Sequence, residues 1–215
     1  MRFALLSLCL ISMSLGVNAQ QKLKMQKNKV LIIFDGSNSM NNQWEMKTKL
    51  ASTREQLFLF LDKCSKYGEL EFALRVFGHQ FPNQVENCND TKLEVNFTFE
   101  SIARIKNILN KLKPQGTSPI EGSLARVEND YMDNVLDKRT VILFADGTDA
   151  CNTKICTTYQ DMMNSSRYEN IFVVGIDIDE EFAQDYKCIS SFRNAVHEQD
   201  LKPILDSIFV AIKPY

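Results

Sequence analysis

Oxygen-bearing side chains follow directly after an apolar run near the beginning of the chain. Val30–Phe34 is followed by Asp-Gly-Ser-Asn-Ser, which puts Asp35, Ser37 and Ser39 on alternate positions. A turn of this kind gathers one carboxylate and two hydroxyls around a single point. Such oxygen donors are hard ligands that suit magnesium or manganese and suit zinc or copper poorly. The spacing therefore predicts a site for a hard divalent cation.

Two more oxygen donors stand where neighbouring elements of the same fold would begin or end. Thr117, preceded by Gly116, lies just before an expected helix, and Asp146 follows the apolar run Thr140–Ala145. Ligands of open parallel sheets bind beyond the carboxyl ends of the strands, so these loops are expected to face one place. Each donor also has an ordinary reading as a hydrogen-bonded turn or a helix cap. The five together favour the metal site.

Five runs of the sequence predict the strands that would position these donors. Three are rich in β-branched residues and lack polar alternation, which is typical of central parallel strands: Val30–Phe34, Thr140–Ala145 and Ile171–Ile176. Leu70–Val76 and Leu93–Phe99 instead alternate apolar and polar residues. We expect the second of these to be an edge strand that pairs antiparallel with the first.

Helices are expected between the strands. Apolar residues recur at a spacing close to 3.6 over Trp44–Lys66, Ile102–Leu112 and Leu201–Ile212. Another helix is expected to open at residues 118–121, where Ser-Pro-Ile-Glu has the form of a capping box. With a short last strand near His197, the pattern predicts an α/β fold. It would be a doubly wound, mostly parallel six-stranded sheet with one antiparallel edge strand and helices on both faces.

Within this frame, Asp35-x-Ser37-x-Ser39, Thr117 and Asp146 resemble the metal-ion-dependent adhesion site (MIDAS) of von Willebrand factor A (vWA) domains. All five positions of that pattern are present and in order. The resemblance covers residues 29–215. The flanking sequences at 74–79, 116–120 and 146–156 are similar to those of a group of exported bacterial members.

The resemblance implies a function as well as a fold. The five residues would hold Mg²⁺, or Mn²⁺ or Ca²⁺ in its place, with one carboxylate acting through water. Because the other donors are neutral hydroxyls, the metal would keep positive charge and an open coordination position. An Asp or Glu of a partner protein would fill that position. The implied activity is binding of a protein, as in adhesion, and not catalysis.

The first residues are typical of a secretory signal peptide. Arg2 precedes the mostly apolar run Ala4–Leu15, and Val17 and Ala19 occupy the small-residue positions before Gln20. An uncleaved anchor is the alternative, but the run is short for a bilayer core, which needs roughly 20 residues. We therefore expect a signal peptide at 1–19, a short polar segment at 20–28 and one domain at 29–215. The mature protein would be secreted or periplasmic and would not span the membrane.

Cleavage would leave five cysteines, an odd number, so at least one thiol is expected to be free or paired between chains. Cys64 falls on the apolar stripe of a predicted helix and is expected to be a core thiol. In the exported proteins that the chain resembles, the pair corresponding to Cys151 and Cys156 recurs, which implies a disulfide between these two. Pairing of Cys88 with Cys188 stays open. Zinc is disfavoured because the sequence has no Cys-x-x-Cys pairs.

Composition and motifs weigh against other classes of function. The net charge is -2 and no basic run occurs, which argues against nucleic-acid binding. The sequence around Asp35 superficially fits phosphotransferases of the haloacid dehalogenase type, but Ser37 stands where these enzymes need a second aspartate. His79 and His197 occur in no Gly-x-Ser-x-Gly context. His79 is expected to hold a neighbouring loop, and His197 to be structural.

The contact rim is expected at residues 41–44, 82–90 and 151–157, where Trp44 is explained equally well by helix packing. The main alternative to metal-dependent protein binding is a metal that only stabilises the domain within an envelope assembly. A magnesium-dependent phosphohydrolase is the less favoured alternative.

Overall fold

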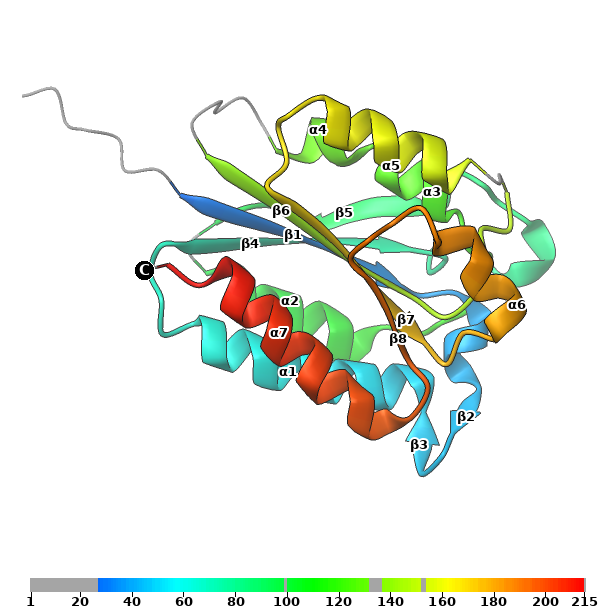
Figure 1. Ribbon diagram of the computed structural model, residues 1–215. Coiled ribbons are helices and arrows are strands. Elements are labelled where there is room, and N and C mark those ends of the chain that lie inside the picture. The colour runs from blue at the N-terminus through cyan, green and yellow to red at the C-terminus, as the bar shows by residue number, and fades with distance from the viewer. Residues whose placement is uncertain (1–26, 99, 132–136, 152–153, 215) are drawn as a thin grey trace, which may run out of the picture.

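A computed structural model describes residues 27–98, 100–131, 137–151 and 154–214 (Figure 1). The expected signal peptide therefore lies outside the described residues. The main sheet has the order β5-β4-β1-β6-β7-β8, and only the pair β4–β5 is antiparallel within it. Its strands are β1 (Asn28–Asp35), β4 (Leu70–Phe77), β5 (Thr91–Val95), β6 (Lys138–Ala145), β7 (Asn170–Ile176) and β8 (Phe192–Ala195). The predicted fold class is confirmed.

Helices cover both faces of the sheet (Figure 1). One face carries α1 (Lys49–Cys64), α2 (Ser101–Lys111) and α7 (Leu201–Ile212), and the other carries α3 (Ile120–Leu124), α4 (Val127–Asp130) and α5 (Ile155–Asn164). Among the described residues, the remaining helical elements are the short α6 (Glu180–Ala183) and the 3-10 turns η1 (Asn38–Asn41), η2 (Asn83–Val85), η3 (Gln184–Tyr186) and η4 (Glu198–Asp200). Over the described residues, no helix combines the length and the apolar character needed to cross a bilayer.

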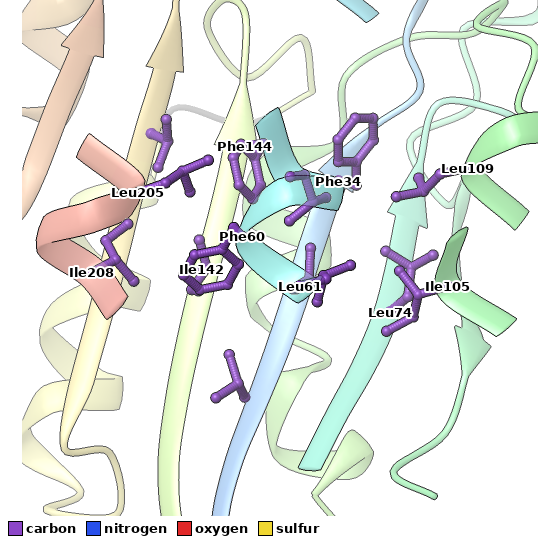
Figure 2. Packing of buried hydrophobic residues seen from close by; sticks show 14 of the residues in the cluster. Phe34, Phe60, Leu61, Leu74, Ile105, Leu109, Ile142, Phe144, Leu205 and Ile208 are labelled. Atoms are coloured by element: carbon purple, nitrogen blue, oxygen red, sulfur yellow. The ribbon is translucent and has the colours of Figure 1, made fainter. Parts of the chain in front are cut away.

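Strand β1 is apolar along its whole length because each of its faces lies in a different core. Ile32 and Phe34 pack with α1, α2 and α7, whereas Leu31 and Ile33 pack with α3, α4 and α5. Figure 2 shows the first of these cores, with Phe34 and residues of β4 and β6 facing α1, α2 and α7. All four side chains are 0% exposed. Burial on both faces explains why the central strands lack polar alternation.

The edge strand is antiparallel as predicted but ends earlier than its sequence pattern. It stops at Val95, and Phe97 turns into the second core, where its ring centroid lies 5.0 Å from that of Tyr131. Strand β4 also contains a charged residue that the core buries. Arg75 donates to both carboxylate oxygens of Asp130, at 2.7 and 2.6 Å. A buried arginine is retained here because a bidentate carboxylate partner compensates its charge.

The segment before α1 is a hairpin and not the first turns of a helix. Strands β2 (Gln43–Trp44) and β3 (Lys47–Thr48) pair antiparallel, and α1 begins only at Lys49. Trp44 is buried and its indole Nε1 donates to the carbonyl of Val196 at 3.1 Å. The tryptophan thus anchors the hairpin, and the prediction of a helix from Trp44 was wrong at its beginning.

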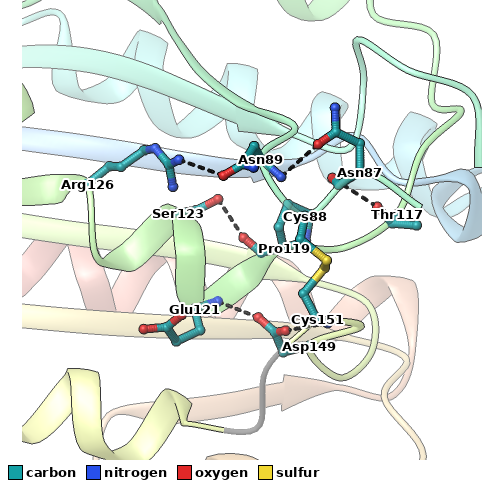
Figure 3. Close-up of a disulfide and its surroundings, with 10 residues drawn as sticks. All are labelled: Asn87, Cys88, Asn89, Thr117, Pro119, Glu121, Ser123, Arg126, Asp149 and Cys151. Carbon is teal, nitrogen blue, oxygen red and sulfur yellow. Dashed lines mark hydrogen bonds between the residues drawn. A yellow bond between two sulfur atoms is a disulfide. The ribbon is translucent and has the colours of Figure 1, made fainter. Parts of the chain in front are cut away.

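The capping box predicted for α3 does not form. The helix begins at Ile120 after Pro119, without a side-chain cap from Ser118. The Asp149 carboxylate, from the loop after β6, accepts instead from the backbone N–H of Glu121 (Figure 3). A carboxylate from a distant loop thus accepts a hydrogen bond from the first turn of α3, a role that the sequence pattern predicted for Ser118.

The disulfide predicted between Cys151 and Cys156 is wrong, and the pairing of Cys88 with Cys188, which was left open, does not form. The structure joins Cys88 to Cys151 and Cys156 to Cys188, with Cα atoms 5.6 and 5.7 Å apart. Cys156 lies in the first turn of α5 and faces the segment after α6, whereas Cys151 faces the loop after β4 (Figure 3). Closeness in sequence was therefore misleading. Cys64 is free and buried, as predicted.

Candidate metal centre

The segment that carries Thr117 is held against the turn that follows β1. Ser37 and Gly116 form an isolated parallel β-bridge, and Asn38 N donates to Gly116 O at 2.9 Å. Gln115 N donates in turn to Gly36 O at 3.1 Å. These backbone bonds bring two segments that are about eighty residues apart in sequence to the same place at the carboxyl edge of the sheet.

Two glycines allow this close approach. A Cβ on Gly116 would lie 2.7 Å from the carbonyl oxygen of Phe81 and 2.9 Å from an Asp90 carboxylate oxygen. Gly78 has φ +67°, and a Cβ there would lie 2.3 Å from Thr117 O. Since real Cβ atoms do not come so near backbone oxygens, larger residues at either position would push the segments apart.

Four of the five predicted ligands form one hydrogen-bonded group. Asp35 Oδ1 accepts from Ser37 N at 2.7 Å, and the hydroxyls of Ser37 and Ser39 lie 2.9 Å apart. Ser39 Oγ donates to Asp146 Oδ1 at 2.6 Å. Asp146 N closes the group by donating to Asp35 Oδ2 at 3.3 Å. The structure thus joins two carboxylates and two hydroxyls in one group, from the end of β1, the turn that follows it and the residue after β6.

The Thr117 side chain is bonded outside this group. Its hydroxyl donates to the carbonyl of Asn87 at 3.3 Å, next to the disulfide of Cys88 (Figure 3). Its backbone neighbour Gly116 is nevertheless bonded to the turn after β1. Thr117 and Ser39 are both partly exposed, whereas Asp35 and Ser37 are buried. The group of oxygen donors is therefore accessible to solvent on the side of the two partly exposed hydroxyls.

The two carboxylates are electrostatically strained. Burial and the nearby Asp146 charge raise the pKa of Asp35 well above its usual value, and burial also raises the pKa of Asp146. Asp146 Oδ2 accepts no hydrogen bond from any described residue, and Lys49 Nζ lies 3.7 Å away. Two neighbouring buried carboxylates are costly to ionise together unless a cation lies between them.

A hard divalent cation fits this set of donors. The group offers only oxygen, from two carboxylates and from hydroxyls, which magnesium, manganese and calcium accept. No three His, Cys, Asp or Glu side chains cluster into a metal site anywhere in the described ranges. Asp35, Ser37, Ser39 and Asp146 are thus the residues whose chemistry and placement suit such an ion. Thr117 follows Gly116, whose backbone is bonded to the turn after β1.

Sequence reasoning missed residues that shape the surroundings of this group. Asp90 is buried and accepts from the backbone N–H groups of Gln80 and Phe81, at 3.0 to 3.1 Å, which folds the loop after β4 over Gly116. Lys49 lies beside Asp146. A lysine within the apolar periodicity of α1 was a signal that could have been noticed, whereas nothing local distinguishes Asp90 from a surface aspartate.

Both histidines bond to glutamates. His79 Nε2 lies 3.0 Å from Glu94 Oε1, and its backbone carbonyl accepts from Gln115 Nε2 at 2.7 Å. The imidazole of His79 is thus bonded to strand β5 and not to a neighbouring loop as predicted, whereas its backbone carbonyl accepts from the segment before Thr117. His197 Nδ1 lies 2.7 Å from Glu45 Oε1 and ties the β2–β3 hairpin to η4. These contacts agree with structural roles for the two imidazoles.

A doubly wound six-stranded sheet with this topology defines a vWA-like α/β domain. No family model matches the chain. At the level of sequence, the chain is similar to YwmD, an uncharacterized protein of Bacillus subtilis (strain 168). The two are 24% identical over 169 residues, which are 76% of this chain and 75% of YwmD.

Solved structures share the fold at low sequence identity. The pilus adhesin SpaC from Lactobacillus rhamnosus GG matches 88% of this chain with a TM-score of 0.69 and 12% identity. The vWF domain of the pili tip protein Mfa5 from Porphyromonas gingivalis matches 88% of this chain with a TM-score of 0.67 and 13% identity. Proximal thread matrix protein 1 of the mussel byssus was solved with a zinc-occupied MIDAS motif. It matches 88% of this chain with a TM-score of 0.65 and 16% identity. The chain spans 31% of SpaC, 47% of the byssus protein and 97% of the Mfa5 domain.

Proposed function

We propose that this protein is an exported interaction module that binds a divalent cation at Asp35, Ser37, Ser39, Thr117 and Asp146. The observation that carries the proposal is the closed group of two carboxylates and two hydroxyls at the carboxyl edge of the sheet. Mg²⁺, Mn²⁺ and Ca²⁺ all suit oxygen donors. The zinc-occupied motif of the byssus protein supports a divalent ion in this fold without deciding which one serves here.

The bound ion would supply positive charge that attracts and coordinates a carboxylate of a partner protein. The chain's own residues hold the donors in place and leave the side of Ser39 and Thr117 partly exposed. The two carboxylates balance the charge of a dication, but with the hydroxyls they do not fill all of the oxygen positions, about six or more, that such an ion takes. A carboxylate oxygen of a partner can complete the coordination.

Apolar residues exposed near this edge support a protein as the partner. Large exposed hydrophobic side chains occur in the segments that follow the ends of β1, β4, β7 and β8, and they are Met46, Phe81, Val85, Phe182 and Val196. Of the rim predicted from the sequence, residues 82–90 contribute Val85, whereas Trp44 is buried. A carboxylate flanked by apolar side chains would match such a rim.

The cysteines support an oxidising location. Two disulfides are present, and such bonds persist outside the reducing cytosol. This agrees with secretion or with a periplasmic location after removal of residues 1–19. We propose binding without catalysis, since the histidines contact glutamates and the haloacid dehalogenase pattern lacks its second aspartate at Ser37.

Metal binding is tested directly with Mn²⁺, whose free form is counted by electron paramagnetic resonance. The wild-type domain should bind Mn²⁺, and Asp35→Asn should lose measurable binding because one carboxylate is neutralised. Asp161→Asn is the matched control, since Asp161 is exposed on α5 and changes the net charge equally. Equal binding by wild type and Asp35→Asn would refute the assigned site.

Partner binding needs a second experiment. The mature domain is immobilised and exposed to its own envelope and secreted fractions with Mg²⁺, with EDTA, and as Asp35→Asn. The proposal predicts a protein retained only by the wild type with metal, and replacement of one acidic residue of that protein should abolish retention. A metal that raises thermal stability while retention is the same in all three conditions would make the ion structural and refute metal-bridged binding.

A further inference from the structure

Lys49 is a buried cation beside the candidate metal centre. It is the first residue of α1, and only 7% of its surface is exposed. Its Nζ lies 3.7 Å from Asp146 Oδ2 and 3.5 Å from Asp177 Oδ2, and it donates to Asp177 O at 3.2 Å. Lysines are almost never so buried unless they are paired. The fold therefore keeps a positively charged side chain next to Asp146.

The surrounding backbone holds Lys49 in position. Its N–H donates to Asn42 O at 3.0 Å, and the Thr48 side chain caps the helix that it begins. Asp177 adopts φ 51°, a left-handed conformation that is unfavourable for a residue other than glycine. In that conformation its carbonyl accepts from Lys49. The ammonium group is thus held beside Asp146 from two sides.

We propose that Lys49 is a resident cation of the metal centre. Its charge weakens the affinity of the centre for a divalent ion and strengthens the binding of an anionic partner to the loaded centre. Without metal, its charge stabilises the ionised Asp146. With metal, Asp35 and Asp146 balance the dication, and Lys49 adds a positive charge. Asp177 Oδ2 lies 3.5 Å from the ammonium group but is 43% exposed on its side chain, so solvent screens it and it offsets this charge only in part. A partner carboxylate would offset the rest, so metal and partner should bind cooperatively. This inference rests on the proposed function.

A different role would give the opposite result. If Lys49 only oriented the Asp146 carboxylate, its removal would weaken metal binding. If it repels the dication, its removal strengthens metal binding. A unit charge several ångströms from a dication changes the affinity by about tenfold even at the dielectric constant of water. The sign of the change therefore separates the two roles.

The test is a titration with Mn²⁺ alone, followed by electron paramagnetic resonance. Lys49→Met and Lys49→Gln should bind Mn²⁺ about tenfold more tightly than wild type, and Lys49→Arg should bind as wild type because it keeps the charge. Lys47→Met is the matched control, since Lys47 lies two residues away on the exposed hairpin and is paired with Glu55. The Mn²⁺ affinity of Lys47→Met should equal that of the wild type, because solvent screens the charge of Lys47.

The outcomes separate this inference from the proposed function. Failure of the wild type to bind Mn²⁺ refutes both. Binding by the wild type with equal or weaker affinity in Lys49→Met and Lys49→Gln refutes the resident cation alone. Thermal melts in EDTA report folding. Variants that unfold in EDTA and fold with Mn²⁺ support the inference, because the metal then replaces the missing charge. Variants that fold in neither condition refute it, since Lys49 would then be required only for the fold.

Discussion

Replacing Cys88 and Cys151 by serine should lower the free energy of unfolding by about 4 kcal/mol. These cysteines are 63 residues apart, and their disulfide closes a loop that contains β5, α2, α3, α4 and β6. A cross-link over that length removes much of the conformational freedom of the unfolded chain. The chain-entropy relation gives about 4 kcal/mol for this loop and a little less for the shorter one closed by Cys156 and Cys188.

The native contacts beside this disulfide should largely persist in the double variant. Thr117 still donates to the Asn87 carbonyl, and Ala150 N still donates to Ser118 O at 3.0 Å. The loss should therefore come mainly from the unfolded state. Urea titrations of the double variant, of Cys156→Ser with Cys188→Ser, and of Cys64→Ala would measure it. Cys64 is the control because it forms no disulfide.

Peptide mapping tests the pairing on which this magnitude depends. Under non-reducing conditions, trypsin should leave fragment 76–92 linked to 140–154, and 155–167 linked to 188–193, since cleavage at Lys154 separates Cys151 from Cys156. A linked pair of 140–154 with 155–167 would contradict the structure. An unchanged urea midpoint for the double variant would contradict the argument from chain entropy even if the pairing is correct.

Three further predictions concern other features. Arg75→Met should cost about 3–5 kcal/mol in urea titrations because Asp130 stays buried without its partner, and adding Asp130→Leu should recover most of the loss. Burial raises the pKa of Cys64 from 9.0 to about 12, so the unfolded chain releases this proton first and stability should fall between these pH values. Cys64→Ala should show a shallower fall, and an equal slope would contradict the assignment. Mg²⁺ at a hundred times its dissociation constant should stabilise the wild type by about 2.7 kcal/mol over EDTA but leave Asp35→Asn unchanged, and equal shifts in calorimetry would place the metal elsewhere.

The central part of the fold could be predicted because strands that are buried on both faces appear in the sequence as continuous apolar runs. Strand β1 is covered on both faces, which makes Val30–Phe34 continuously apolar, and Asp35 follows where the strand ends. The parallel topology then gathers the loops after β1 and β6 at one edge. Four of the predicted ligands lie together for this reason, since topology and not local sequence brings Asp146 to Ser39.

Features decided by distant contacts could not be predicted in the same way. Met46 fits the helical spacing but is 85% exposed, because Trp44 anchors a hairpin through Val196. Asp149 replaces the local cap at α3, and its position depends on the path of another loop. The disulfides follow the same rule, since each joins segments that the sheet and its helices bring together.

The contact between the beginning of β1 and the end of α7 has a mechanical consequence. Asn28 and Ile212 are joined by a hydrogen bond of 3.3 Å at the end of the sheet opposite to the candidate metal centre (Figure 1). A partner that pulls at Asp35 against either end would exert tension along β1. Because β1 lies between parallel neighbours β4 and β6, that tension would shear the bonds of both ladders together instead of opening them one at a time. The domain would therefore resist traction along this axis better than traction across the sheet.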